Sequence, residues 1–177
     1  GINAIAVTGN HAYVVSGFYS NSGYYVQLEI VDISNPAAPN VVGSYDMPSI
    51  PTYNAGETGC VAISGNYAYI ADYYNGLLIL DISSPSSPKL TAKYDVACDT
   101  SDIDVVGNYA YVADGIKGLE IFDIIDPSSP ELVGRCETNG SANRITVSGN
   151  YAYVTTSTEG GNDYSLLIVD INNPSLP

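Results

Sequence analysis

The residues that could do chemistry in this chain are few. His11 is the only histidine in 177 residues, so any Ser-His-Asp or Cys-His arrangement would have to use it. The densest acidic stretch, CDTSDID at 98–104, brings Asp99, Asp102 and Asp104 together. It lacks the ligand pattern of an EF-hand loop, although loop carboxylates can hold calcium weakly. A weak Ca²⁺ site and a solvated loop are both open, and no other cofactor is expected.

A repeated unit must position these residues. The hexapeptide GNYAYI or GNYAYV occurs at 65–70, 107–112 and 149–154, and GNHAYV stands at 9–14. Each copy is followed by a run of the type LLIVD and then by a turn of the type NPAAP. His11 takes the place of a repeated tyrosine, and the aspartate that ends LLIVD recurs in every unit, so both are expected to be structural. The aspartate is expected to accept backbone N–H bonds at the turn.

Each unit holds four short runs, which we name a to d in chain order. They are rich in Val, Ile and Tyr and are bounded by Gly, Asn, Pro and Asp, which is typical of β-strands. The GN pair between runs a and b favours a tight turn with positive φ. No segment keeps a 3.6-residue period, so almost no helix is expected.

Four-stranded units repeated about every 42 residues predict an all-β protein built from the blades of a β-propeller. We expect a single propeller domain, 1–177, that is either four-bladed or four consecutive blades of a larger propeller. Closure into a small ring is the favoured alternative. The four blades are expected at approximately 2–53, 57–98, 101–140 and 143–177.

The motifs in this order, GNYAYVAD, L-x-I-V-D and DISNPxxP, resemble the LVIVD-repeat β-propeller proteins over essentially the whole chain. The resemblance implies a propeller, commonly found in bacterial and archaeal secreted or surface proteins. It brings no catalytic residues with it. The chain departs from the pattern because its first unit is enlarged and its last unit lacks run d.

Charge and composition narrow the range of partners. The chain has 19 acidic and 5 basic residues, a net charge of −14, which argues against nucleic acid and anionic membrane surfaces. No run approaches the roughly 18 apolar residues of a spanning helix, so membrane insertion is not expected. Scarce lysine and 16 tyrosines, with frequent Asn, Ser and Gly, are often seen outside the cell. We therefore expect an extracellular or cell-surface protein.

The missing run d has a consequence for association. Without it, run c of the fourth unit would be an exposed hydrophobic edge. Either later residues of a longer protein supply the strand, or a neighbouring subunit adds one. The second alternative predicts self-association or an adjacent propeller module, as in a filament or tandem array. The edge residues are Leu166, Leu167, Ile168, Val169 and Asp170.

Extra residues concentrate in the b–c loops of units 1 and 4 and in the connection after unit 1. In a closed ring these segments would gather on one face. Aromatic side chains with acceptors suit a protein or carbohydrate partner, whereas tolerated insertions are the plain alternative. The predicted patch consists of Phe18, Tyr19, Tyr24, Tyr25, Tyr53, Glu57, Glu159, Asp163 and Tyr164.

Two contacts near the propeller axis are also expected. Asp104 and Arg144 fall on inner strands and are predicted to pair across the channel. Cys60 and Cys98 lie close to the inner strands on the loop-rich face, so a Cys60–Cys98 disulfide is the favoured pairing, with all thiols reduced as the alternative.

These patterns favour a non-enzymatic extracellular structural or binding module. A soluble propeller that binds a protein or carbohydrate through its enlarged loops is the first alternative. A polysaccharide-active enzyme domain is the second, and it would require turnover that is lost when Glu57 or Glu159 is changed.

Overall fold

The computed structural model of the chain describes residues 1–20, 23–48, 59–95, 100–158 and 163–177. Within these ranges every regular element is a β-strand. Blade 1 contains β1 (Ile2–Thr8), β2 (His11–Ser20), β3 (Gly23–Asp32) and β4 (Asn40–Asp46). Blade 2 contains β5 (Val61–Ser64), β6 (Tyr67–Asp72), β7 (Gly76–Asp81) and β8 (Lys89–Tyr94). Blade 3 contains β9 (Thr100–Val106), β10 (Tyr109–Asp114), β11 (Leu119–Asp123) and β12 (Glu131–Cys136), and blade 4 contains β13 (Ser141–Ser148), β14 (Tyr151–Ser157) and β15 (Tyr164–Asp170).

Each blade is one antiparallel sheet whose strands pair in chain order. Blades 1 to 3 have four strands, and the described part of blade 4 has three, in the order β13-β14-β15. The all-β propeller-like fold and the absence of run d from the last blade are therefore confirmed.

The turns form as the repeated motifs predict. The four GN glycines have φ between 55° and 60°, which L side chains rarely adopt. The aspartate at the end of each third strand accepts the N–H of the residue two positions on. The four bonds run to Asp32, Asp81, Asp123 and Asp170 at 2.8, 2.8, 2.8 and 2.9 Å. The structural role expected for this aspartate is thus confirmed.

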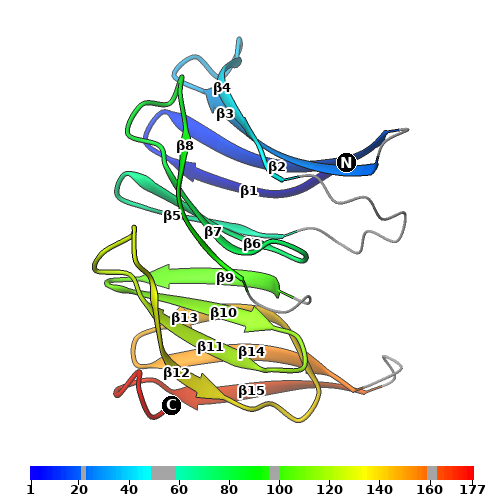
Figure 1. Ribbon diagram of the computed structural model, residues 1–177, viewed down its shortest axis with the longest axis vertical. Helices are drawn as coiled ribbons and strands as arrows, with labels where there is room; N and C mark the ends of the chain where they lie inside the picture. Colours follow the sequence, from blue (N-terminus) through cyan, green and yellow to red (C-terminus); the bar gives the residue numbers. More distant parts are fainter. Residues whose placement is uncertain (21–22, 49–58, 96–99, 159–162) are drawn as a thin grey trace.

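The blades follow one another in an open arc (Figure 1). The first strands of successive blades, β1, β5, β9 and β13, lie next to each other. Blades 1 and 4 lie at opposite ends of the long axis of the molecule (Figure 1). The favoured closure into a four-bladed ring is therefore wrong, and four consecutive blades of a larger propeller describe the structure. Three joints of this kind do not rotate the sheets far enough for the ends to meet.

Three apolar cores fill the joints between successive blades. Tyr69, Leu77 and Ile79 of blade 2, for example, pack with Ile103, Val112 and Phe122 of blade 3. Equivalent side chains make the other two cores, which explains why the chain repeats one short sequence. Each fully buried Leu, Ile or Phe contributes about 1.5–3 kcal/mol relative to exposure, so these joints dominate stability.

A second contact fastens the outer part of two joints. A Cβ on Gly134 of β12 would lie 1.9 Å from the carbonyl oxygen of Pro174 in the next blade. A Cβ on Gly43 of β4 would lie 2.0 Å from the carbonyl oxygen of Pro85. Glycine thus lets the NPAAP-type turn of one blade sit on the fourth strand of the blade before it.

No described segment is a helix of the length and apolar character needed to cross a membrane.

Candidate functional site

The two ends of the arc expose side chains that every internal joint buries. We call the side of a blade that faces the next blade its forward face and the opposite side its rear face. Leu28, Leu77 and Leu119 occupy one forward-face position in blades 1 to 3, and all are fully buried. Their equivalent in blade 4, Leu166, is 60% exposed. Ile168 shows the same contrast: it is 56% exposed, whereas its three equivalents are fully buried.

The rear face of blade 1 shows the complementary pattern. Ile5 is 62% exposed, whereas its equivalents Val61, Ile103 and Ile145 are at most 9% exposed. Val7 beside it is also exposed. Each end of the arc therefore presents one half of a blade–blade joint, and the two halves are of opposite kind. The repeat itself could have indicated both faces, because it shows which positions are apolar in every blade. In a closed ring these positions would be covered, so the sequence did not predict that they are exposed.

The residues of the predicted strand-completion edge lie in β15, at the end of the described sheet of blade 4. β15 pairs with β14 on one side only among the described strands. Val169 points into the core of the joint with blade 3, and Leu167 packs against that core. Leu166 and Ile168 alternate with them onto the exposed forward face, as the period of two in a strand requires. Asp170 accepts the N–H of Asn172 at 2.9 Å.

The predicted loop patch is not one surface. The insertion in blade 1 lengthens the hairpin of β2 and β3 up to the pair Ser20↔Gly23 instead of forming a loop. Phe18 and Tyr25 stack there with ring centroids 5.6 Å apart and an interplanar angle of 13°. Tyr164 begins β15 and is exposed, but it belongs to the opposite end of the arc (Figure 1).

The remaining patch residues have more limited placement. Tyr19 and Tyr24 pair through their backbones in the long hairpin. The backbone carbonyl of Asp163 accepts the N–H of Thr158 at 3.0 Å, beside Tyr164. Tyr53, Glu57 and Glu159 lie outside the described residues.

Two carboxylates of the acidic cluster in blade 3 accept hydrogen bonds from backbone N–H groups. Asp102 accepts the N–H of Ile103 and, with its other oxygen, the N–H of Ile145 in blade 4, both at 2.9 Å. Asp104 does the same for Val105 at 2.8 Å and Val147 at 2.7 Å. Both carboxylates thus join the free inner edges of β9 and β13, which charge-assisted hydrogen bonds do well.

This arrangement bears on two predictions. Asp99 lies outside the described residues, and no group of three or more described His, Cys, Asp or Glu residues is placed to hold a metal ion. The predicted Asp104–Arg144 pair does not form. Arg144 instead donates through Nη1 to Sγ of Cys60 at 3.2 Å and to the carbonyl of Ser101 at 3.5 Å. Backbone N–H groups at a sheet edge need acceptors, and they take both carboxylates.

Cys60 is a free thiol in the structure, and Cys98 lies outside the described residues, so the disulfide stays a prediction. Burial raises the pKa of the Cys60 thiol to about 12. The Asp102 carboxylate adds to this rise through a hydrogen bond and its charge, and Arg144 opposes it. A thiol in this state is a poor nucleophile.

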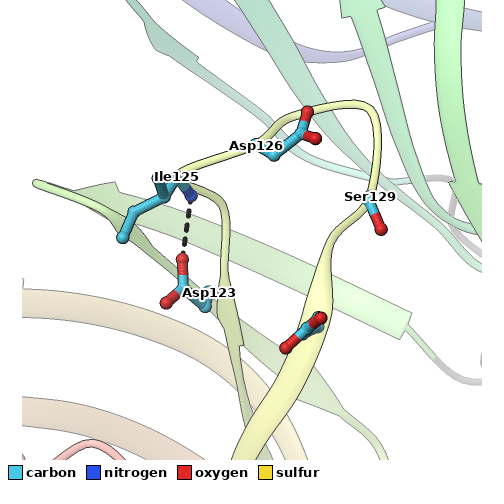
Figure 2. A pocket seen from close by; sticks show the side chains of 5 residues that line it. Asp123, Ile125, Asp126 and Ser129 are labelled. Carbon is cyan, nitrogen blue, oxygen red and sulfur yellow. Dashed lines mark hydrogen bonds between the residues drawn. The ribbon is translucent and has the colours of Figure 1, made fainter.

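Figure 2 shows a shallow pocket of about 260 Å³ at the turn after β11. It is lined by Asp123, Ile125, Asp126, Ser129 and Glu131. Asp123 accepts the N–H of Ile125 at 2.8 Å, shown as the dashed line, and Asp126 accepts the N–H and hydroxyl of Ser128. These bonds lower the pKa of Asp126. The carboxylates of Asp123 and Asp126 thus hold the turn together.

Buried carboxylates that sequence reasoning missed are also structural. Glu120 is fully buried and forms an ion pair with Arg135 on the neighbouring strand. Asp114 is buried against Lys117 at 2.9 Å and accepts the Thr100 hydroxyl at 3.2 Å. Glu120 and Arg135 lie opposite each other on adjacent strands, so this pair became visible only with the strand register, whereas Asp114 and Lys117 lie three residues apart in one turn.

Comparison with known proteins supports the fold. A family model described as LVIVD repeat matches residues 3–47, 55–96, 97–138 and 139–177. The crystal structure of the computationally designed Ika4 protein is similar, with a TM-score of 0.65 and 11% identity over 96% of this chain and 91% of that one. No curated protein matches the chain.

Two longer solved structures are similar as well. One is a functionally unknown protein from Desulfotomaculum acetoxidans DSM 771, with a TM-score of 0.68 and 18% identity over 94% of this chain and 55% of that one. The other is the computationally designed Ika8 protein, with a TM-score of 0.63 and 9% identity over 96% and 58%. The chain thus spans little more than half the length of either, and at these identities the likeness shows the fold alone.

Proposed function

The chain belongs to the LVIVD repeat family, and from this premise we propose that it is a non-enzymatic structural module that binds other protein through the two end faces of its arc. Its setting is extracellular or on the cell surface, in line with its acidic, tyrosine-rich and lysine-poor composition. The partner is a set of propeller blades, supplied by an adjacent module or, in a solution of the chain alone, by other copies of it.

One observation carries the proposal. Leu166, Ile168 and Ile5 are each more than half exposed at repeat positions that are buried in every other blade. Large exposed apolar patches on a soluble protein mark interaction sites, and here the internal joints show what covers such a patch. The acidic turns elsewhere offer no comparable surface, since their carboxylates are taken up by backbone N–H groups.

The experiment is to follow the mass of the 177-residue chain by light scattering as its concentration rises. The native chain should associate, and the double variant Ile5→Lys with Ile168→Lys should not. Ile125→Lys is the matched control, because Ile125 is equally exposed but lies on a turn. A native chain that stays single at every concentration would refute the proposal.

The outer edge of β15 supports a second contact by strand addition. Its edge has no fourth strand among the described residues, unlike β3, β7 and β11. A peptide of residues 40–46, NVVGSYD, copies the fourth strand of blade 1 and should protect the backbone amides of β15 from hydrogen exchange. The same peptide with Gly43→Pro lacks a ladder donor and serves as its control. Equal protection by both peptides would exclude strand addition.

The hairpin of β2 and β3 supports a carbohydrate or protein contact as a second candidate function. Phe18 and Tyr25 stack and Phe18 is half exposed, which gives an aromatic platform near the tip. Phe18→Ala should abolish binding to a polysaccharide panel if the hairpin is a sugar site, and unchanged binding would exclude it. The polysaccharide-active alternative depends on Glu57 and Glu159, which lie outside the described residues.

A further inference from the structure

We propose that two copies of this chain join head to tail into a closed ring of eight blades. In each of the two joints, the forward face of blade 4 in one copy covers the rear face of blade 1 in the other. This inference rests on the proposed function and names its partner: a second copy of the same chain.

The two end faces of the arc match each other. Every internal joint places a forward face that carries Tyr, Leu and Ile against a rear face that carries branched aliphatic side chains. Blade 4 offers Tyr153, Leu166 and Ile168 at these forward positions, and blade 1 offers Ile5 and Val7 at the rear positions. Two forward faces or two rear faces would not reproduce any joint that the chain forms. A second copy supplies the correct partner for both ends at once.

The number of blades also fits a ring of two copies. Four blades form an open arc (Figure 1), and two such arcs contain eight, which lies within the range of natural propellers. The same fold makes up 55% and 58% of the two longer structures that resemble it. A head-to-tail contact gives a ring when its rotation closes and a filament when it does not. Since each new joint copies an internal one, it continues the same curvature, and two arcs close when each joint rotates the blades by one eighth of a turn.

Two features make the new joint weaker than an internal one. Blade 4 has no fourth strand among its described residues, so the Pro36 turn of the other copy finds no glycine to sit on, unlike Pro85 and Pro174. The rear face of blade 1 also carries Glu29, at the position of Leu78 in blade 2 and of Glu120 in blade 3. Glu120 has Arg135 opposite it, whereas Glu29 has Ser44. We therefore expect a reversible dimer with free chain at low concentration.

The experiment is sedimentation equilibrium on the full 177-residue chain and four single variants. The native chain should reach twice its 18.6 kDa mass and stop there. Ile5→Lys and Ile168→Lys should each raise the dimer dissociation constant at least about 100-fold, because each replaces an apolar contact of the joint by a charged side chain that must lose its water. Glu29→Leu, which copies blade 2, should tighten the dimer about tenfold or more. Ile125→Lys should leave it unchanged.

The other outcomes distinguish a failure of the eight-bladed ring from a failure of the proposed function. Growth past two copies, or a loss of association in only one of the two lysine variants, would overturn the closed head-to-tail ring and leave the proposed function standing. Weakening by Glu29→Leu would also overturn the ring, since Glu29 would then serve the joint, and an unchanged dissociation constant would overturn it by placing Glu29 outside the joint. A single chain at all concentrations would overturn both. Circular dichroism of each variant checks that its blades remain folded.

Discussion

The repeat offers a matched pair of substitutions that measures how much a covering blade contributes. Leu119 and Leu166 occupy one repeat position, but Leu119 is fully buried under blade 4, whereas Leu166 is 60% exposed. Replacing a buried leucine by alanine costs about 2–5 kcal/mol, from lost transfer energy and the cavity left behind. At Leu166 only about two fifths of the surface is covered, so the transfer loss of three carbon groups shrinks to about 1 kcal/mol. The difference between the two variants should be about 2 kcal/mol.

Urea unfolding, followed by circular dichroism, measures this difference. It is done at a concentration where light scattering finds a single chain, so that no second copy covers Leu166. Leu119→Ala should lower the free energy of unfolding by about 2 kcal/mol more than Leu166→Ala. The dependence of this free energy on urea concentration should stay unchanged. Equal losses would mean that another blade covers Leu166 in the single chain. The open arc would then be refuted.

Three further predictions concern other contacts. Gly134→Ala should lower the free energy of unfolding in urea by about 1–3 kcal/mol, because its Cβ would lie 1.9 Å from the carbonyl oxygen of Pro174. The matched variant Ala92→Gly should lower it by less than about 1 kcal/mol. Equal losses would rule out the close approach. Hydrogen bonds from the side chain and backbone of Ser83 lower the pKa of Asp81, so its contribution to stability is present above the unfolded pKa of about 3.9 and is lost as pH falls through the folded pKa. The urea midpoint of the native chain should therefore fall below about pH 4, and it should fall less in Asp81→Asn. An identical fall in the two proteins would refute this role of Asp81. Burial raises the pKa of Cys60 to about 12, so little of its thiol is ionised at about pH 8. In a variant with Cys98→Ser and Cys136→Ser, Cys60 should therefore react with iodoacetamide on the order of 1,000-fold more slowly than an ordinary thiol. A normal rate would contradict the burial of Cys60.

The blades could be predicted from the sequence because their determinants are local. The GN turn needs a glycine with positive φ, and the aspartate after each third strand bonds to an N–H two residues away. Such signals lie within a few residues of each other, so a repeat displays them four times. The missing strand of blade 4 and the edge at β15 could be read in the same way.

The shape of the assembly could not be predicted because its determinants lie between blades. The rotation at each joint depends on how side chains such as Phe122 and Tyr94 fill the space between two sheets, and no local pattern records that. Asp104 and Arg144 were expected to attract each other, yet the free inner N–H of Val147 takes the carboxylate. The Gly134–Pro174 contact did leave a trace, since glycine or alanine stands at the same place in blades 1 to 3.

The Ser-, Gly- and Asn-rich insertion in blade 1 favours a loop, but the structure makes it part of two strands. Phe18 and Tyr25 are direct partners across β2 and β3, so the extra residues lengthen a hairpin. Because blades 1 and 4 lie at opposite ends of the arc, the candidate binding surface is divided between these ends instead of forming one patch.

The most direct test of the open arc is the distance between its two ends in a single chain. Spin labels on Val31→Cys in β3 and Leu166→Cys in β15, with the three native cysteines replaced by serine, would be measured by pulsed electron resonance in an excess of unlabelled protein. Packed sheets lie about 10 Å apart, so three joints separate these two strands by roughly 30 Å. A separation of about 30 Å is the predicted result. A separation near one sheet spacing, about 10 Å, would show that blade 4 covers blade 1 within one chain and would contradict the account.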